Sequence, residues 1–273
     1  MNDKYLIAFD MDGTLLNSKK KISFLTKHYL RKLAKQGHKI ILSSGRPSRA
    51  LKSYYNELGL DTPMVCYNGA FYFSPNDKNF RSHEFEFPKE IVCKIYNEVK
   101  PYAKNVMCET DTEIWLDKKD LYLAKFFWYE GMNMHYGDLP IILNKNPMTM
   151  IVQTPKEFEN NDRHIIDNIV EKYEGIAARY WTGSPYFELF YKGTSKGEAI
   201  KEVAKYYGLD KDHIIVFGDA ENDIEMFDAA GVPIAMKNGK NFVKKCAKYI
   251  SLKDNDHNGI YYTLKAFFKG KLS

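Results

Sequence analysis

Two aspartates, Asp10 and Asp12, directly follow an apolar run and are the residues of this chain best placed to do chemistry. Residues 5–9 are continuously apolar, as expected of a central parallel strand covered on both faces. In near-extended backbone, side chains two positions apart leave on the same side, and Gly13 permits a sharp turn after them. Two carboxylates held this close require a cation. Taken alone, an Asp-x-Asp-Gly sequence fits a strand followed by an ordinary turn equally well.

A second polar segment follows the next expected strand, at residues 39–42. It contains Ser44, Gly45 and Arg46, and Pro47 suits the first position of a helix. Hydroxyl and amide donors at a helix N-terminus favour a phosphate ligand. An ordinary serine-capped helix start explains this segment about as well when it is taken alone.

A third polar segment, Gly-Asp-Ala-Glu-Asn-Asp at residues 218–223, follows an apolar strand at 213–217, and Lys196 opens the helix before that strand. In open parallel sheets, ligands bind beyond the carboxyl ends of the strands. We therefore expect the three polar segments and Lys196 to converge on one site.

This combination resembles the haloacid dehalogenase superfamily of phosphohydrolases, and specifically its Cof-type subgroup, in which a large α/β cap is inserted after the third strand. The resemblance covers nearly the whole chain. Beyond the segments above, it includes residues 67–70 (Tyr-Asn-Gly-Ala), 194–197 (Thr-Ser-Lys-Gly) and 255–260.

The resemblance implies a role for each matching residue. Asp10 is the expected nucleophile, and Asp12 is the expected general acid and base, because one carboxyl can protonate the leaving oxygen and then deprotonate water. The residues expected to bind the phosphate or the substrate are Ser44, Gly45, Arg46, Asn68, Lys196 and Asn222. The residues expected around Mg²⁺ are Asp10, Asp12 through its main-chain carbonyl, Asp219 and Asp223. A ligand set made only of oxygen atoms suits Mg²⁺. For Arg46, a structural salt bridge is nearly as good an explanation as substrate binding.

Two positions depart from the family pattern. Ser44 stands where threonine is frequent, which preserves the hydroxyl group. Lys237 stands where glycine is common, within an Ala-Met-x-Asn segment, and we interpret that departure as affecting a surface loop.

The order of elements predicts an α/β fold: a Rossmann-like core with a parallel sheet and helices on both faces, plus an inserted α+β cap. We expect the core at residues 1–84 and 188–273 and the cap at 85–187. The expected core strands are 5–9, 39–42, 64–67, 213–217, 232–236 and 249–250, and the expected core helices are 24–36, 47–58, 196–207, 224–230 and 241–247. The expected cap strands are 84–87, 106–108, 113–116, 148–153, 176–180 and 186–190, and the expected cap helices are 89–99, 119–129 and 157–173.

Composition is that of a soluble, globular chain with a mild excess of positive charge. The 273 residues have a formal net charge of +5, which we interpret as spread along the chain without a basic block. Residues 19–21, three lysines, are expected to form a solvated turn. We expect a small phosphorylated metabolite as partner, no nucleic acid, no membrane span, a monomer or weak homodimer, and a cytoplasmic location.

The leading functional hypothesis is a Mg²⁺-dependent phosphatase that forms an aspartyl-phosphate intermediate. Its substrates would be sugar phosphates, or phosphorylated cofactors such as pyridoxal phosphate or flavin mononucleotide. A phosphomutase of the phosphomannomutase type is an enzymatic alternative that Asp12 also permits. A regulator that binds a phosphometabolite without catalysis is disfavoured, because it would have no need of Asp12.

Overall fold

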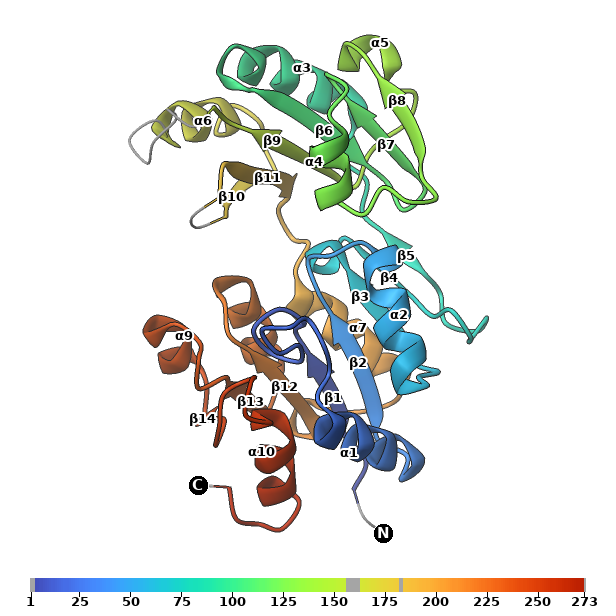
Figure 1. The fold of residues 1–273 in the computed structure, drawn as a ribbon, viewed down its shortest axis with the longest axis vertical. Coiled ribbons are helices and arrows are strands. Elements are labelled where there is room, and N and C mark those ends of the chain that lie inside the picture. The colour runs from blue at the N-terminus through green and yellow to red at the C-terminus, as the bar shows by residue number, and fades with distance from the viewer. Residues whose placement is uncertain (1–2, 156–162, 182–183, 273) are drawn as a thin grey trace. The chain divides into compact units, whose positions relative to one another are not determined.

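The computed structural model describes residues 3–155, 163–181 and 184–272 (Figure 1). The chain divides into two compact units, Met1–His83 with Ser195–Ser273, and Glu84–Thr194. The second unit ends at Thr194, beyond the expected boundary at Phe187, because its last strand runs to Tyr191.

The first unit is built on a sheet with the strand order β14-β13-β12-β1-β2-β3-β4-β5. The strands from β14 to β3 pair in parallel, and β4 pairs antiparallel with β3. The central strand β1 is fully buried, which explains its uninterrupted apolar sequence. The strand bounds are β1 Leu6–Phe9, β2 Lys39–Ser43, β3 Met64–Cys66, β4 Phe71–Phe73, β5 His83–Glu84, β12 Ile214–Gly218, β13 Val232–Ala235 and β14 Tyr249–Ile250.

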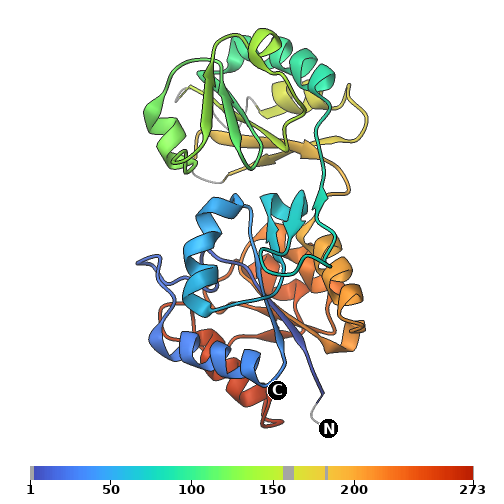
Figure 2. The ribbon, with the colours of Figure 1, turned by 90° about the vertical axis from the view of Figure 1, so that its right-hand side faces the viewer.

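Helices cover both faces of this sheet (Figure 2). Leu6 and Ala8 pack with residues of α7 and α8 in one buried cluster, whereas α1 packs against β2 and α10. This architecture confirms the predicted α/β class. The helix bounds are α1 Phe24–Lys35, α2 Ser48–Leu58, α7 Lys196–Tyr206, α8 Ile224–Ala229, α9 Asn241–Cys246 and α10 Gly259–Phe267.

The second unit has a sheet with the order β10-β11-β9-β6-β7-β8, antiparallel except for the pair β7–β8. One face packs around Trp115 against helices α3 and α6. The strands are β6 Asn105–Glu109, β7 Glu113–Leu116, β8 Asn133–Tyr136, β9 Thr149–Gln153, β10 Ile176–Tyr180 and β11 Tyr186–Tyr191, and the helices are α3 Lys89–Val99, α4 Leu121–Phe126, α5 Leu139–Ile142 and α6 Arg163–Val170.

Several expected elements of this unit were wrong in extent. The strand expected at 84–87 is instead β5, His83–Glu84, which belongs to the sheet of the first unit, and Phe87 is fully buried in the apolar cluster around Trp115. The helix expected at 119–129 is the shorter α4, and Trp128 beyond it has a left-handed backbone (φ 54°). The helix expected at 157–173 begins outside the described residues, and its described part is α6.

No helix among the described residues is both long and apolar enough to cross a membrane.

Candidate active site

Main-chain hydrogen bonds hold the polar segments together at the carboxyl ends of the parallel strands. The Asp10 N–H, just past β1, donates to the carbonyl of Phe217 in β12 (3.0 Å). Past β2, the Ser44 N–H donates to the carbonyl of Val65 in β3 (2.9 Å), and the Asn68 N–H donates to the carbonyl of Ser44 (2.9 Å). The strand ends thus bring together the segments that the sequence analysis expected to converge.

A buried lysine joins two of the expected carboxylates. Lys196 Nζ donates to Asp10 Oδ1 (2.6 Å) and to Asp223 Oδ1 (2.7 Å), and the Lys196 and Asp223 side chains are 0% exposed. Lys196 is the first residue of α7, and the hydroxyl of the N-cap residue Ser195 accepts from the N–H of Glu198 (3.1 Å). The N-cap hydrogen bond of Ser195 therefore fixes the start of α7, where Lys196 lies.

A third carboxylate, Asp219, lies beside this pair. Asp223 Oδ2 accepts from the N–H groups of Asp219 (2.9 Å) and Ala220 (3.0 Å), and Thr14 Oγ1 donates to Asp219 Oδ1 (2.9 Å). Carboxylate oxygens of Asp10, Asp219 and Asp223 all lie within 4.8 Å of one another. The sequence predicted that these three residues would meet, but not that Thr14 would contact one of them.

Burial and mutual repulsion both disfavour the ionised forms of the carboxylates in this cluster. Burial raises the pKa of Asp10 well above its ordinary value; Lys196 opposes the rise, and Asp223 and Asp219 add to it. Burial and then the Asp223 charge raise the pKa of Asp219 to about 6. Burial would lower the pKa of Lys196, but Asp10 and Asp223 outweigh it and raise that pKa. Hard oxygen donors around an excess of negative charge fit a divalent cation such as Mg²⁺.

The Asp12 side chain points to a different set of partners. Arg46 Nε donates to Oδ2 (2.7 Å), and Arg46 Nη2 and Lys20 Nζ donate to Oδ1 (2.6 and 2.5 Å). Burial would raise the pKa of Asp12, but these two cations outweigh it and lower the pKa. The side chain is 42% exposed and is not part of the three-carboxylate cluster, so any contact of Asp12 with a metal through its main-chain carbonyl stays a prediction.

Lys20 was expected only as part of a solvated turn. It is exposed (61%), as expected, but its ammonium group pairs with Asp12. Its backbone is left-handed (φ 55°), and the Tyr54 hydroxyl donates to its carbonyl (3.0 Å). The run of three lysines did not indicate which of them would pair with Asp12.

The remaining expected residues lie around Asn68. Its Oδ1 accepts from Asn222 Nδ2 (2.9 Å), and a Cβ on Gly45 would approach Asn68 Nδ2 to 2.9 Å. The hydroxyl of Ser44 accepts from the Arg46 N–H (3.2 Å). The expected phosphate-binding groups are therefore neighbours, although the sequence did not predict the amide pair between Asn68 and Asn222.

One further residue that the sequence analysis did not assign to the site is Asn238. Its Nδ2 donates to the carbonyl of Gly13 (2.7 Å), and its Oδ1 accepts from the N–H of Asn255 (3.1 Å). The side chain thus connects the loop after β13 to the turn after β1 by a hydrogen bond. The only sequence signal was its place in the Ala-Met-x-Asn segment.

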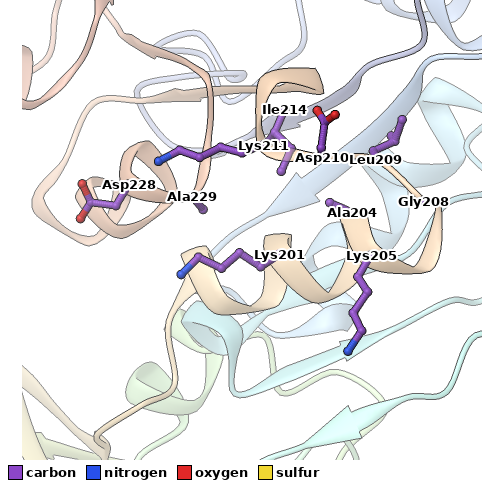
Figure 3. Close-up of a pocket in the computed structure, with 10 residues that line it drawn as sticks. All are labelled: Lys201, Ala204, Lys205, Gly208, Leu209, Asp210, Lys211, Ile214, Asp228 and Ala229. Carbon is purple, nitrogen blue, oxygen red and sulfur yellow. The ribbon is translucent and has the colours of Figure 1, made fainter.

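A pocket of about 620 Å³ is lined by residues of α7, α8 and the segment that leads into β12 (Figure 3). Its lining includes Lys211 and Ile214, which stand at the amino end of β12, whereas Asp219 follows the carboxyl end. The pocket is therefore separate from the candidate site.

Comparison with known proteins agrees with the fold. Residues 7–264 match the family described as haloacid dehalogenase-like hydrolase. The chain is 32% identical to the 5-amino-6-(5-phospho-D-ribitylamino)uracil phosphatase of Bacillus subtilis, over 97% of each chain. It is 25% identical to a phosphatase of the same description from Escherichia coli, over 89% of each chain.

Among solved structures, a haloacid dehalogenase-like hydrolase from Bacteroides thetaiotaomicron superposes with a TM-score of 0.81, at 25% identity, covering 97% of this chain and 100% of that one. The chain belongs to the haloacid dehalogenase-like hydrolases. Within that family it is a phosphatase, as the sequence predicted.

Proposed function

We propose that the chain hydrolyses phosphoric monoesters of small metabolites with Mg²⁺, through a phosphoryl group carried transiently on Asp10. The observation that carries this proposal is the cluster of Asp10, Asp219 and Asp223, in which the ammonium group of Lys196 pairs with Asp10 and Asp223. Asp10, Asp219 and the main-chain carbonyl of Asp12 would hold the cation, with Asp223 in support. When bound, Mg²⁺ would offset the negative charge of the phosphate as the carboxylate approaches it.

In the first step, an Asp10 oxygen forms a bond to phosphorus while the bond between phosphorus and the ester oxygen breaks. The leaving oxygen takes a proton from the Asp12 carboxyl group. Lys196 serves this step because its ammonium group, already 2.6 Å from Asp10 Oδ1, is a preorganised positive charge that can also contact a phosphoryl oxygen.

In the second step, water attacks the phosphorus of the aspartyl-phosphate and gives a proton to Asp12. The bond from phosphorus to Asp10 breaks, so inorganic phosphate leaves and the carboxylate is restored. Arg46 orients Asp12 through two parallel hydrogen bonds, a planar pairing that also adds geometric specificity. Arg46 and Lys20 lower the pKa of Asp12 against the effect of burial, which favours the carboxylate that the first step leaves and that the second step uses as its base; proton donation in the first step draws on the less populated protonated form.

The substrate we propose first is a phosphate ester on a sugar or sugar-alcohol chain. The relative from Bacillus subtilis is named for 5-amino-6-(5-phospho-D-ribitylamino)uracil, and its similarity extends over 97% of both chains. Other sugar phosphates, pyridoxal phosphate and flavin mononucleotide are the comparison substrates.

We also propose that the unit Glu84–Thr194 acts as a cap that selects the substrate. It has its own sheet and its own buried core, so replacing residues 85–187 by a short Gly/Ser linker should leave the first unit folded. Such a chain should hydrolyse a small aryl phosphate without ranking metabolites. An unchanged ranking would place selection in the first unit.

The experiment that tests the function is release of inorganic phosphate from this panel with Mg²⁺, after EDTA, and after Mg²⁺ is restored. Asp10→Asn should abolish release, whereas Asp228→Asn, a carboxylate of the separate pocket, should not. If an isomeric phosphate ester formed with little inorganic phosphate, the enzyme would be a phosphomutase. Undiminished release by Asp10→Asn would refute the proposal.

A further inference from the structure

Lys237 belongs to the loop after β13, which lies beside Asp219: a Cβ on Gly239 of this loop would come within 3.1 Å of the Asp219 backbone. It follows β13, whose Ala235 is the register partner of Gly218 in β12, and the Met236 N–H donates to the Gly218 carbonyl (2.8 Å). Neighbouring strands lie about 4.8 Å apart. The backbone of Lys237 is therefore level with the segment after Gly218 that carries Asp219.

The loop that carries Lys237 has a fixed backbone. The Lys237 N–H donates to the hydroxyl of the buried residue Ser251 (2.9 Å), and the Gly239 N–H closes a turn onto the carbonyl of Met236 (2.9 Å). Asn238 fastens the loop to Gly13. These contacts are made by the main chain and by Asn238, so the lysine side chain is not needed to hold the loop.

The Lys237 side chain itself is exposed. Among the described residues, no carboxylate lies within salt-bridge distance of its ammonium group, in contrast to Lys20, which pairs with Asp12. A compact, strongly hydrated ammonium group on a flexible stem is well suited to attract a phosphate from solution.

A further cation near the site would favour the binding of a phosphate. Lys196 pairs with Asp10 and Asp223, and Asp219 lies within 4.8 Å of both carboxylates. With the proposed Mg²⁺ bound, the formal charges of these groups cancel, so the cluster offers an approaching phosphate dianion no net attraction. We propose that Lys237 is a substrate-binding residue of this chain, which attracts the dianionic phosphate ester to the site and strengthens its binding; this role rests on the proposed phosphatase function. Its effect falls on binding rather than on the chemical step, because the charge acts equally before and during phosphoryl transfer.

The test compares Lys237→Glu, Lys237→Gln and Lys237→Arg with Lys211→Glu. Lys211 precedes β12, so the length of that strand, roughly 16 Å, separates it from Asp219. Lys211→Glu changes the net charge of the protein by the same amount as Lys237→Glu. Steady-state kinetics are measured at ionic strengths of about 0.01 M and about 1 M, where the Debye lengths are about 30 Å and about 3 Å.

At low ionic strength, Lys237→Glu should raise KM roughly three- to tenfold and leave kcat within about twofold. Lys237→Gln should have a smaller effect, Lys237→Arg should resemble the wild type, and the differences should vanish at high ionic strength. An unchanged KM in Lys237→Glu, or an equal rise in Lys211→Glu, would overturn the proposal.

Calorimetric binding of inorganic phosphate to the same proteins gives a readout without turnover. The dissociation constant should rise in Lys237→Glu by the factor seen in KM. If no ester were hydrolysed, the proposed function would fail, while this measurement would still decide whether Lys237 attracts the anion. Equal phosphate affinity in wild type and Lys237→Glu would refute the role of Lys237.

Discussion

The ammonium group of Lys196 lies 2.6 Å from Oδ1 of Asp10, and no part of the lysine side chain is exposed. The same group lies 2.7 Å from Asp223. One buried cation thus balances two carboxylates that belong to segments far apart in the sequence, and it links the helix start at α7 to the strand ends of β1 and β12. This arrangement makes the site part of the structural core, with consequences for stability as well as for catalysis.

Replacing Lys196 by methionine should destabilise the protein strongly. The substitution leaves Asp10 and Asp223 buried without a cation, and breaking a buried ion pair from one side costs about 3–5 kcal/mol. Urea unfolding in EDTA measures this loss. Lys205→Met, which removes an exposed lysine of the same helix, is the matched control. A loss below about 1 kcal/mol in Lys196→Met would contradict the role of Lys196 as the charge balance.

The Asp219 carboxylate should couple stability to Mg²⁺. The wild type should melt at a higher temperature with Mg²⁺ than with EDTA, because a ligand that binds only the folded state stabilises it. Asp219→Asn should melt in EDTA no lower than the wild type, since it reduces the repulsion within the cluster, and should respond much less to Mg²⁺. Asp228→Asn should respond as the wild type does. An Asp219→Asn protein with the full Mg²⁺ response would show that this carboxylate is not a ligand.

A side chain at position 69 would collide with the backbone of Ser195, so this position requires glycine. Its φ is +97°, and an added Cβ would lie 2.1 Å from the carbonyl oxygen of Ser195, the residue before Lys196. We expect Gly69→Ala to cost more than Gly208→Ala, which shares a positive φ (+66°) but has nothing within 4 Å of the added atom. The extra cost should be roughly 1–3 kcal/mol, the usual range for overpacking. Equal losses of unfolding free energy in the two variants would count against the close approach of Gly69 to Ser195.

His38 should make stability depend on pH. Its Nδ1 accepts from the Tyr5 N–H (3.1 Å), which requires a neutral ring, and burial and then Lys4 lower its pKa in the folded state. The unfolded state, with a histidine pKa of about 6.5, therefore binds more protons between the two pKa values. Stability contributed by His38 is complete above about pH 6.5 and is lost as the pH falls through the folded pKa.

His38→Asn keeps an acceptor near the same position and removes the titrating group. Its unfolding free energy should fall less steeply between pH 7.5 and 5 than that of the wild type. The comparison is made by urea unfolding across this range. Identical slopes in the two proteins would show that His38 is not a source of the pH dependence.

Sequence patterns predicted the parts of the site that depend on strand ends. Asp10, Ser44 and Asp219 each follow an apolar strand, and parallel pairing brings such ends together whatever the loops do. The patterns did not predict the contacts of Lys20 and Asn238, because both depend on loop conformations. Lys20 has a left-handed backbone, which lysine seldom adopts and which no residue type near it signals.

Irregular backbone also explains the errors in the fold. Helix α4 is shorter than its apolar periodicity suggests, and the left-handed Trp128 lies beyond its end. Helix α10 was not predicted at all. Its N-cap residue Asn258 has a left-handed backbone, and a Cβ on the next residue, Gly259, would lie 2.0 Å from the carbonyl oxygen of Lys253. Periodicity reports which face of an element is buried, but not where tertiary contacts stop it.

The most direct test of the central claim is to locate the phosphoryl group on the enzyme. In Asp12→Asn, an activated aryl phosphate should still phosphorylate Asp10, because its leaving group needs no proton, while attack of water should be slow for lack of a base. After acid quenching, peptide mass spectrometry should find the mass of one phosphoryl group on Asp10, and none in the Asp10→Asn/Asp12→Asn double variant. A phosphoryl group on another residue, or aryl phosphate cleaved by Asp12→Asn at the full wild-type rate with no covalent species at any time, would contradict the account.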